Sequence, residues 1–319
     1  MSAVASSVRN VLSTSEVRQL VADDYALQPT RISLIESGHN DTYAVETNGT
    51  RFAFRVYGHG KSWIREASDL RFELDLLTHL RAHHAPVSFP IERRSGDTLG
   101  TRSSTGDRYY ALFSWCPGRP IDTKDLTLEE AERLGAALAF IHVAADSFVT
   151  QHSRYVLDER LLLERSLQRM RRTLDGASPD DARFIENCVV QVGDRLRNFD
   201  PGPAGWGLIH GDPQVLNCHF AGDGTVTFFD FDHCGLGWRA YDIAYCLRHT
   251  NAAGDQRGHE IRSAVIDGYE SVRPMGQAER QMLPTLGQAA WIREGTAAGQ
   301  GLAPKKLIRL LQDPYGPWE

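Results

Sequence analysis

The first third of the chain alternates between apolar and polar residues, which is the pattern of half-buried β-strands. Strand-like runs cover Thr30–Ser37, Thr42–Thr47 and Phe52–Tyr57. Asn48 and Gly49 separate the second and third runs, and both residue types tolerate positive φ. The pattern therefore predicts three strands, the last two of them joined by a tight hairpin turn.

Helical spacing flanks these strands. Residues 13–27 begin with Ser and Thr capping residues and continue with apolar residues at helical spacing, and residues 62–83 carry leucines along one face. A further hairpin is expected over residues 87–113. Together these elements predict a small α+β lobe with a five-stranded antiparallel sheet and one long helix.

The periodicity becomes helical after the segment Pro117–Pro120. The predicted helices cover residues 126–145, 157–174, 179–199, 239–252, 257–272, 277–297 and 304–312. An island of strand and loop at residues 206–233 interrupts them. We therefore expect two lobes, with the boundary between them near residues 114–120.

Composition excludes several classes of protein. The chain has 319 residues, of which 41% are hydrophobic and 24% charged, the balance of an ordinary globular protein. A formal net charge of −6 argues against a general nucleic-acid-binding protein. The five cysteines form no CxxC pair, and no apolar run is long enough for a signal peptide or a membrane span. A cytoplasmic protein with reduced thiols is expected, without a nucleic-acid or membrane partner.

The segment 206–233 contains the candidate catalytic and metal-binding residues. A His-Gly-Asp motif ends at Asp212, Asn217 follows five residues later, and a hairpin with a Gly-Asp-Gly turn brings Asp230 back beside them. Transfer of a phosphoryl group to a hydroxyl needs one carboxylate that orients the hydroxyl and accepts its proton, together with oxygen ligands for Mg²⁺. Asp212, Asn217 and Asp230, in this order and at this spacing, can supply the carboxylate base and the oxygen ligands.

The motif around His210 and Asp212, with Asn217 and the later run Phe229–Asp232, resembles the aminoglycoside phosphotransferase and choline kinase family. The similarity extends from about residue 30 to about residue 250. It implies a bilobal protein-kinase-like fold with a catalytic hairpin embedded in a mainly helical C-terminal lobe.

Specific roles follow from this resemblance. It implies Asp212 as the catalytic base, Asn217 and Asp230 as metal ligands, Mg²⁺ as the cofactor, and ATP or GTP as the phosphoryl donor. Asp242 matches an aspartate that supports the catalytic loop in relatives.

The resemblance also assigns the lobes. Residues 1–113 would be the nucleotide-binding lobe and residues 114–120 the hinge. Residues 121–319 would be the helical lobe, with the catalytic loop at 208–233 and the acceptor pocket.

A kinase lobe needs a loop over the phosphates, a cation on the third strand and a helix carboxylate that positions this cation. Arg55 stands where the family usually has lysine, and its charge and fork also suit phosphate oxygens, whereas Lys61 lies in a loop and is the poorer candidate. Glu73 resembles the partner carboxylate, with Glu66 as a rival. The other nucleotide-binding candidates are the loop residues Ser37, Gly38, His39 and Asn40 and, from the resemblance, the hinge residues Ser114, Trp115 and Cys116.

Two residues of the island have open roles. Asp232 is either a second metal ligand or a solvated acid, and His210 is expected to hold the loop by hydrogen bonds rather than to take part in chemistry.

Two other functions also stay open. A metallohydrolase could use mixed His and carboxylate ligands for Zn²⁺ or Mn²⁺. Its candidate ligands would be His210, Asp212, His219, Asp230, Asp232 and His233. A nucleotide-binding pseudokinase acting as an interaction module would explain Arg55 and the segment 213–215, where relatives often have Leu-His-Pro-Gly.

The small-molecule acceptor of the phosphoryl group is not identified by the sequence. The helical segments 155–200 and 250–300 are expected to build its pocket, with Arg293 as a candidate to face it and Trp291 either facing it or packing in the core. An antibiotic, a natural-product sugar, an amino alcohol, an amino acid and a protein serine all fit this reading.

Overall fold

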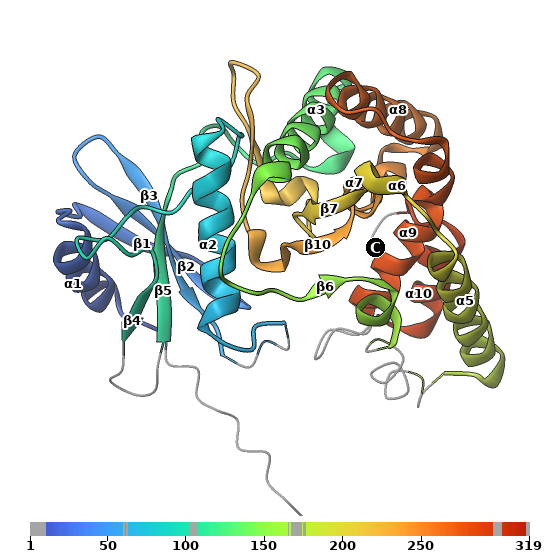
Figure 1. Ribbon diagram of the computed structural model, residues 1–319, viewed down its shortest axis with the longest axis horizontal. Coiled ribbons are helices and arrows are strands. Elements are labelled where there is room, and N and C mark those ends of the chain that lie inside the picture. Colours follow the sequence, from blue (N-terminus) through green and yellow to red (C-terminus); the bar gives the residue numbers. More distant parts are fainter. Residues whose placement is uncertain are drawn as a thin grey trace, which may run out of the picture. The chain divides into compact units, whose positions relative to one another are not determined.

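The computed structural model describes residues 11–59, 61, 63–102, 108–164, 166, 174, 177–295 and 302–316. The chain forms two compact units. The first comprises residues 1–78 and 88–115, and the second comprises residues 79–87 and 116–319. A sheet dominates the first unit and helices dominate the second (Figure 1).

A five-stranded antiparallel sheet forms the centre of the first unit, and it confirms the predicted sheet. Its strands are β1 (Arg31–Ser37), β2 (Asn40–Glu46), β3 (Arg51–Tyr57), β4 (Gly100–Arg102) and β5 (Arg108–Ser114). Their order across the sheet is β1-β2-β3-β5-β4. The central strand β3 carries Arg55, which lies opposite Thr42 of β2 and Ala111 of β5.

This unit also contains α1 (Thr14–Tyr25) and all of α2 (Ala67–Ala82) except its last four residues, which group with the second unit. A capping box starts α1, in which the side chains of Ser13 and Glu16 each accept a hydrogen bond from the other residue's backbone N–H. Val17 of this helix is fully buried in the core that α1 forms with the sheet.

The helix expected over residues 62–83 begins only at Ala67. The reason is the carboxylate of Asp69, which accepts hydrogen bonds from the backbone N–H groups of Arg65 (2.9 Å) and Glu66 (3.3 Å). These bonds fix a turn before the first helical residue and cap the helix there.

The hairpin expected over residues 87–113 is shorter than predicted, because its first strand starts at Gly100. The preceding segment meets the sheet through an isolated bridge between Pro90 and Phe113. Proline has no N–H to give to a strand ladder, so this segment runs beside the sheet without joining it as a strand.

The second unit is mainly helical, as predicted. Its helices are α3 (Leu128–Ala144), α5 (Pro179–Arg197), α6 (Gly202–Gly205), α7 (Arg239–Cys246), α8 (Asp255–Val272), α9 (Gln277–Gly295) and α10 (Pro304–Gln312). Helix α7 ends earlier than the predicted 239–252, because His249 adopts a left-handed conformation with φ 66°. The helix expected over 157–174 starts with a π-helical turn at Arg160–Glu164. Ser166 and Leu174 are also helical, and the rest of residues 165–176 lie outside the described residues.

Helices α3 and α8 lie side by side (Figure 1) and approach closely at two glycines. A Cβ added at Gly135 would lie 1.9 Å from the backbone oxygen of Val265, and one at Gly268 would lie 1.9 Å from that of Glu132. The absence of a side chain at both positions lets the two backbones touch.

Two small sheets interrupt the helices. The predicted hairpin is formed by β8 (Cys218–Phe220) and β9 (Val226–Phe228). A three-stranded sheet of β6 (Val156–Leu157), β10 (Gly235–Trp238) and β7 (Trp206–Ile209), in that order, was not predicted in full. Strands of two to four residues, one with glycine at every second position, carry no alternation of polar and apolar side chains.

Candidate active site

The segment predicted to be the catalytic loop, which keeps that name below, leaves β7 at His210. The carboxylate of Asp242, at the start of α7, accepts hydrogen bonds from the backbone N–H groups of His210 (2.7 Å) and Gly211 (2.9 Å). Asp242 is fully buried. Both carboxylate oxygens therefore hold the backbone directly before Asp212, which agrees with the supporting role expected for this residue.

Gly211 is required by the path of the loop. Its φ is 80°, and a Cβ at this position would lie 2.1 Å from the backbone oxygen of His233. A side chain here would be strained in conformation and would clash with backbone, so the loop depends on glycine at this position.

The ring of His210 is fully buried and bonded on both sides. Nδ1 accepts a hydrogen bond from the N–H of Asp212 (3.3 Å), so the neutral ring donates through Nε2 to the backbone oxygen of Phe229 (3.0 Å). His210 thus ties the catalytic loop to the end of β9. Neither nitrogen is left for chemistry in this arrangement.

Asn217 and Asp212 contact each other. The amide Nδ2 of Asn217 donates to the backbone oxygen of Asp212 (2.9 Å) and to its Oδ2 (3.3 Å). The backbone oxygen of Asn217 accepts from the N–H of Phe229 (3.0 Å), directly before Asp230. Asp230 has a left-handed conformation (φ 63°, ψ 59°), which is uncommon outside glycine and turns the chain sharply after β9.

Burial raises the pKa of Asp212 from 3.8 to about 6, and the negative charge of Asp230 acts in the same direction. The positive charges of Arg248 and Arg293 oppose this rise in pKa. Oδ1 of Asp212 is buried and accepts no hydrogen bond from the described part of the chain. A carboxylate with these properties is suited to take up a proton from a partner placed at Oδ1.

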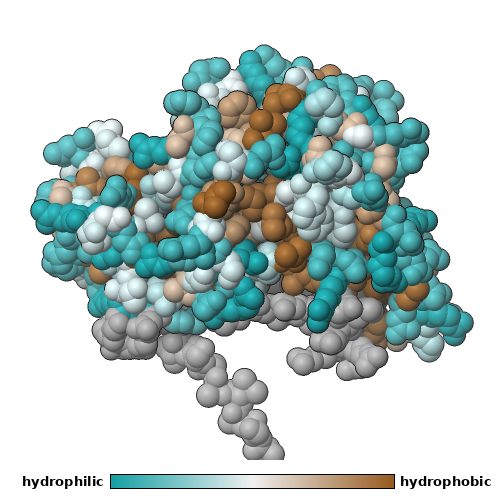
Figure 2. Space-filling view, viewed as in Figure 1, coloured by the Kyte–Doolittle hydropathy of each residue, from teal (hydrophilic) through white to brown (hydrophobic). Residues whose placement is uncertain are grey.

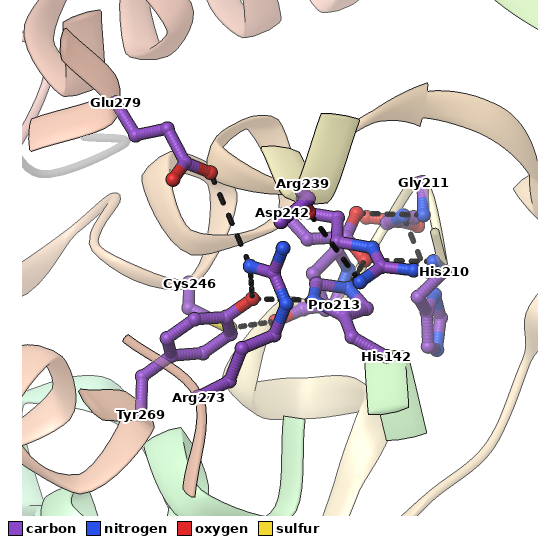
Figure 3. A network of polar contacts seen from close by, with 12 residues as sticks. His142, His210, Gly211, Pro213, Arg239, Asp242, Cys246, Tyr269, Arg273 and Glu279 are labelled. Atoms are coloured by element: carbon purple, nitrogen blue, oxygen red, sulfur yellow. Dashed lines mark hydrogen bonds and ion pairs between the residues drawn. The ribbon is translucent and has the colours of Figure 1, made fainter. Parts of the chain in front are cut away.

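A buried polar network extends from Asp242 into the helices (Figure 3). Nε2 of His142, on α3, donates to Asp242 (3.0 Å), and burial lowers the pKa of this histidine. Nδ1 of the neutral ring must then accept from the hydroxyl of Tyr269 (2.8 Å), which in turn accepts from Arg273 (3.1 Å). Our prediction missed His142, although its place on the apolar face of a predicted helix is a signal that could have found it.

Arg293 and Trp291, both on α9, serve the fold of the site. Arg293 donates to the backbone oxygen of Gly211 (2.9 Å) and to Nδ1 of His233 (2.7 Å), so it connects the catalytic loop with the turn that follows Asp230. Trp291 is fully buried and donates from Nε1 to the backbone oxygen of Pro314 (2.9 Å). Core packing is therefore the role of Trp291.

In the first unit, Arg55 and Glu73 form the expected ion pair. Nη1 of Arg55 lies 3.1 Å from Oε1 of Glu73, whose side chain is fully buried, and the Arg55 side chain is 11% exposed. The rival Glu66 instead lies in the turn before α2. A kinase lobe needs a contact between a cation on the third strand and a carboxylate on the following helix, and this ion pair provides it. That the pair binds a nucleotide stays a prediction.

The turn between β1 and β2 is tied down by polar contacts. Oδ1 of Asn40 accepts hydrogen bonds from Nζ of Lys61 and from the N–H of Gly58 (3.3 Å). The N–H of Gly38 donates to the backbone oxygen of Asn40 (2.9 Å). Asn40 and Lys61 thus connect the turn with the segment after β3.

Two further contacts hold the same turn. The hydroxyl of Ser37 donates to Asp41 (2.8 Å), which also pairs with Arg108 of β5 (3.2 Å). The ring of His39 meets the ring of Trp63 edge-on, with their centres 5.3 Å apart.

The three hinge candidates have different surroundings. Ser114 forms hydrogen bonds through both its backbone and its hydroxyl within the first unit. The guanidinium of Arg51 lies 3.7 Å from the ring centre of Trp115, and in the second unit the backbone oxygen of Cys116 bonds to Nδ1 of His219 (3.1 Å). A hinge role for these residues remains a prediction.

The metallohydrolase alternative finds no support in the described residues. The ring nitrogens of His210 bond to backbone groups, and His219 and His233 bond through Nδ1 to Cys116 and Arg293. Asp232 is buried, and its backbone oxygen accepts from Arg154. Within the ranges that the structure describes, no group of three or more His, Cys, Asp or Glu side chains is arranged to hold a metal ion.

A model of the phosphotransferase enzyme family matches residues 31–282. The chain therefore belongs to this family, and the prediction of a phosphotransferase is confirmed. An uncharacterised protein of Deinococcus radiodurans is 32% identical over 92% of this chain and 84% of its own length. A homoserine kinase of Phenylobacterium zucineum is 28% identical, covering 92% of this chain and 90% of its own.

Solved structures confirm the fold. A microcompartment-associated aminopropanol kinase has a TM-score of 0.76 at 21% identity and covers 95% of both chains. An amicoumacin kinase in complex with AMP-PNP and Ca²⁺ has a TM-score of 0.77 at 17% identity, covering 97% of this chain and 96% of its own. At this identity the likeness concerns the fold alone.

The described helices include none that is both long and apolar enough to cross a membrane. Hydrophilic residues cover most of the face shown in Figure 2, with apolar residues in small patches between them.

Proposed function

We propose that this phosphotransferase transfers the γ-phosphoryl group of ATP or GTP to a hydroxyl of a small molecule, with Asp212 as the base. The hydroxyl oxygen forms a bond to the γ-phosphorus, and the bond from that phosphorus to its bridging oxygen breaks. The hydroxyl proton passes to Asp212, and the nucleoside diphosphate leaves.

The hydrogen bonding of the two Asp212 carboxylate oxygens is the main support for this proposal. Asn217 (3.3 Å) and Gln214 (3.4 Å) donate to Oδ2, whereas the buried Oδ1 has no hydrogen bond from any described residue. One oxygen is thus fixed in place and the other is left for the acceptor hydroxyl. Leaving a buried carboxylate oxygen without a hydrogen bond costs about 1–3 kcal/mol, which is consistent with a group kept ready for a ligand.

Asn217 and Asp230 fit Mg²⁺ by their chemistry. Nδ2 of Asn217 donates to Asp212, which leaves the amide oxygen of Asn217 as one ligand, and the carboxylate of Asp230 would be the other. Mg²⁺ takes oxygen ligands and in kinases is held largely by phosphates and water, so two protein ligands suffice. When bound, Mg²⁺ would neutralise charge on the phosphate oxygens.

The nucleotide is assigned to residues 1–113, with Arg55 and Glu73 toward the phosphates and residues 114–120 as the hinge. The ion pair of Arg55 with Glu73 supports this assignment. Related structures with AMP-PNP or ADP also support a nucleotide donor. Relatives named as homoserine and aminopropanol kinases support a small hydroxylated acceptor. The five free cysteines fit a cytoplasmic enzyme.

The test is a screen for release of ADP or GDP with Mg²⁺ and ATP or GTP over hydroxylated metabolites and antibiotics. Asp212→Asn is expected to lower kcat by about 10²–10⁴-fold, because the amide cannot accept the proton. Nucleotide affinity, measured by calorimetry, should change little.

The control is Asp223→Asn, the same chemical change at an exposed position in the turn of the β8–β9 hairpin. It should retain full activity. If the wild-type protein binds nucleotide but phosphorylates no member of the panel, the pseudokinase is the better assignment.

A further inference from the structure

A chain of buried side chains connects the C-terminal end of α8 with the catalytic loop. Nη1 of Arg273 donates to the hydroxyl oxygen of Tyr269 (3.1 Å), and this hydroxyl meets Nδ1 of His142 (2.8 Å). Nε2 of His142 in turn meets Oδ2 of Asp242 (3.0 Å). All four residues are buried, and they follow one another from α8 through α3 to α7 (Figure 3).

The protons of this chain all point toward Asp242. Arginine can only donate hydrogen bonds, so the oxygen of Tyr269 accepts from Arg273 and the hydroxyl proton is directed at Nδ1 of His142. If Nδ1 carried a proton, the hydroxyl of Tyr269 would have to turn away, and the described part of the chain offers this hydroxyl no other acceptor. A buried hydroxyl proton without an acceptor is unfavourable, so the arrangement favours a neutral ring that donates from Nε2.

The charge of His142 matters because its acceptor oxygen is shared. Oδ2 of Asp242 accepts from Nε2 of His142 (3.0 Å) and from the backbone N–H of His210 (2.7 Å). A positively charged ring would form a shorter and stronger bond to Oδ2 and would draw this oxygen away from His210. His210 and Gly211, both held by Asp242, directly precede Asp212. The charge of His142 therefore affects the backbone that places the proposed base.

Several charged and titratable groups act on the ring of His142. They are Asp242 and Arg239 of α7 and Tyr269 and Arg273 of α8. Burial lowers the pKa of His142, Asp242 opposes this, and the two arginines add to the lowering. Behind the arginines, Arg239 pairs with Asp146, and Arg273 lies 4.0 Å from Glu279 of α9. Arg273 thus disfavours a charged ring in two ways, through its own charge and through the direction that it gives to the Tyr269 hydroxyl.

We propose that Arg273 and Tyr269 are positioning residues for phosphoryl transfer, which keep His142 neutral and so hold Asp242 and the catalytic loop in the geometry that places Asp212. Neither residue touches the nucleotide or the acceptor in this proposal, because both act through His142. The inference rests on the proposed function and adds residues that lie far from Asp212 in the sequence.

The test compares Arg273→Lys with Arg273→Gln. Lysine keeps the charge and can only donate, whereas the neutral amide of glutamine can also accept the Tyr269 hydroxyl and so releases its direction. At about pH 5.5 an ordinary histidine is mostly protonated. Nitrogen NMR of labelled histidine, with the His142 signal assigned by its absence in His142→Gln, should show a neutral ring at this pH in the wild type and in Arg273→Lys. The ring should be protonated in Arg273→Gln.

The kinetic measurement is the kcat of each variant relative to the wild type, with Mg²⁺ATP and the acceptor found by the screen, or with water as the acceptor. For Arg273→Gln this ratio should fall about 5- to 100-fold between about pH 8 and pH 5.5, the range for one lost buried hydrogen bond. For Arg273→Lys it should stay constant. The ratio removes the titration of Asp212, which both proteins share, and the KM of the nucleotide should not change.

Arg183→Gln, the identical change at a side chain that is 71% exposed on α5, is the matched control and should behave as wild type. Because Arg273→Gln leaves Glu279 without its cation, thermal denaturation must show that it is folded. If it is not, the double variant Arg273→Gln with Glu279→Gln takes its place. A merely structural role of Arg273 would lower the stability of the variants without changing the protonation of His142.

Three results would overturn the inference and leave the proposed function intact. They are a neutral His142 ring in folded Arg273→Gln at the acidic pH, a protonated ring in Arg273→Lys, and a protonated ring with a constant kcat ratio. Failure of the wild type to turn over Mg²⁺ATP with any acceptor would instead overturn the proposed function. The two failures are distinguishable, because the NMR measurement needs no turnover.

Discussion

Arg55 is the residue at which this chain departs most clearly from the lysine expected in a kinase lobe. Its ion pair with the buried Glu73 predicts that Arg55→Met lowers the free energy of unfolding by about 3–5 kcal/mol, because the acid then loses a partner in a buried site. Arg55→Lys keeps the charge but not the fork, so less than half of that loss is expected. Urea denaturation of both variants measures the two values.

Arg31→Met is the matched control, since Arg31 lies exposed at the start of the edge strand β1. It should change the unfolding free energy by no more than about 0.5 kcal/mol. Equal losses in Arg55→Met and Arg31→Met would mean that the pair contributes little to the first unit.

At the scale of single residues, spacing along the chain predicted the candidate site residues that lie close together in the sequence. Asp212, Asn217 and Asp230 stand close in sequence, so a hairpin was enough to predict their grouping, although their catalytic roles stay untested. His142 could not be predicted in this way. His142 meets Asp242 from 100 residues away, and such contacts depend on how helices pack.

The packing of α3 against α8 depends on glycine at the point where the helices meet. An exposed helical Gly→Ala change stabilises a protein by up to about 1 kcal/mol, because glycine is the more flexible residue in the unfolded chain. Gly135→Ala should have the opposite sign and cost about 1–3 kcal/mol, since the new Cβ would lie 1.9 Å from the backbone oxygen of Val265. Thermal or urea denaturation gives the sign directly.

Gly222→Ala in the β8–β9 hairpin is the control, because a Cβ there would meet nothing within 4 Å. It should be neutral. A stabilised Gly135→Ala protein would show that α3 and α8 can move apart at no cost, and that their close approach is not required.

At the scale of elements, long periodic segments were predictable and short ones were not. Strands β2, β3 and β5 of the first unit and helices such as α5 and α8 follow apolar patterns over many residues, which local sequence specifies well. The sheet of β6, β10 and β7 is held by pairing between segments far apart in the chain, so no local pattern reveals it. Helix starts were shifted by single capping side chains such as Asp69.

At the scale of the whole molecule, the residues proposed for phosphoryl transfer lie within one short stretch of the second unit, from Asp212 to Asp230 around the β8–β9 hairpin. The helical segments 155–200 and 250–300, which are expected to build the acceptor pocket, lie outside this stretch of sequence. A motif in the short stretch therefore identifies the reaction class without specifying the acceptor.

The stability of the folded protein should fall in acid because of His249, which sits between α7 and α8. Burial lowers the pKa of His249 from 6.5 to about 4, and Arg248 and Lys306 act in the same direction while Asp122 opposes them. Between these pH values the unfolded chain binds a proton that the folded protein does not, so stability contributed by neutral His249 is present above about pH 6.5 and is lost as the pH falls toward 4. The full loss corresponds to about 3 kcal/mol.

His249→Asn tests this expectation, because asparagine tolerates the left-handed conformation at this position (φ 66°) and does not titrate. Urea unfolding of the wild type and the variant should be measured from pH 7.5 to 4. The difference between the two proteins removes the contribution of other titrating groups, including Asp212, whose raised pKa acts in the opposite direction. The gap should shift by about 3 kcal/mol in favour of the variant on acidification, and a constant gap would mean that His249 is protonated as readily in the folded protein as in the unfolded chain.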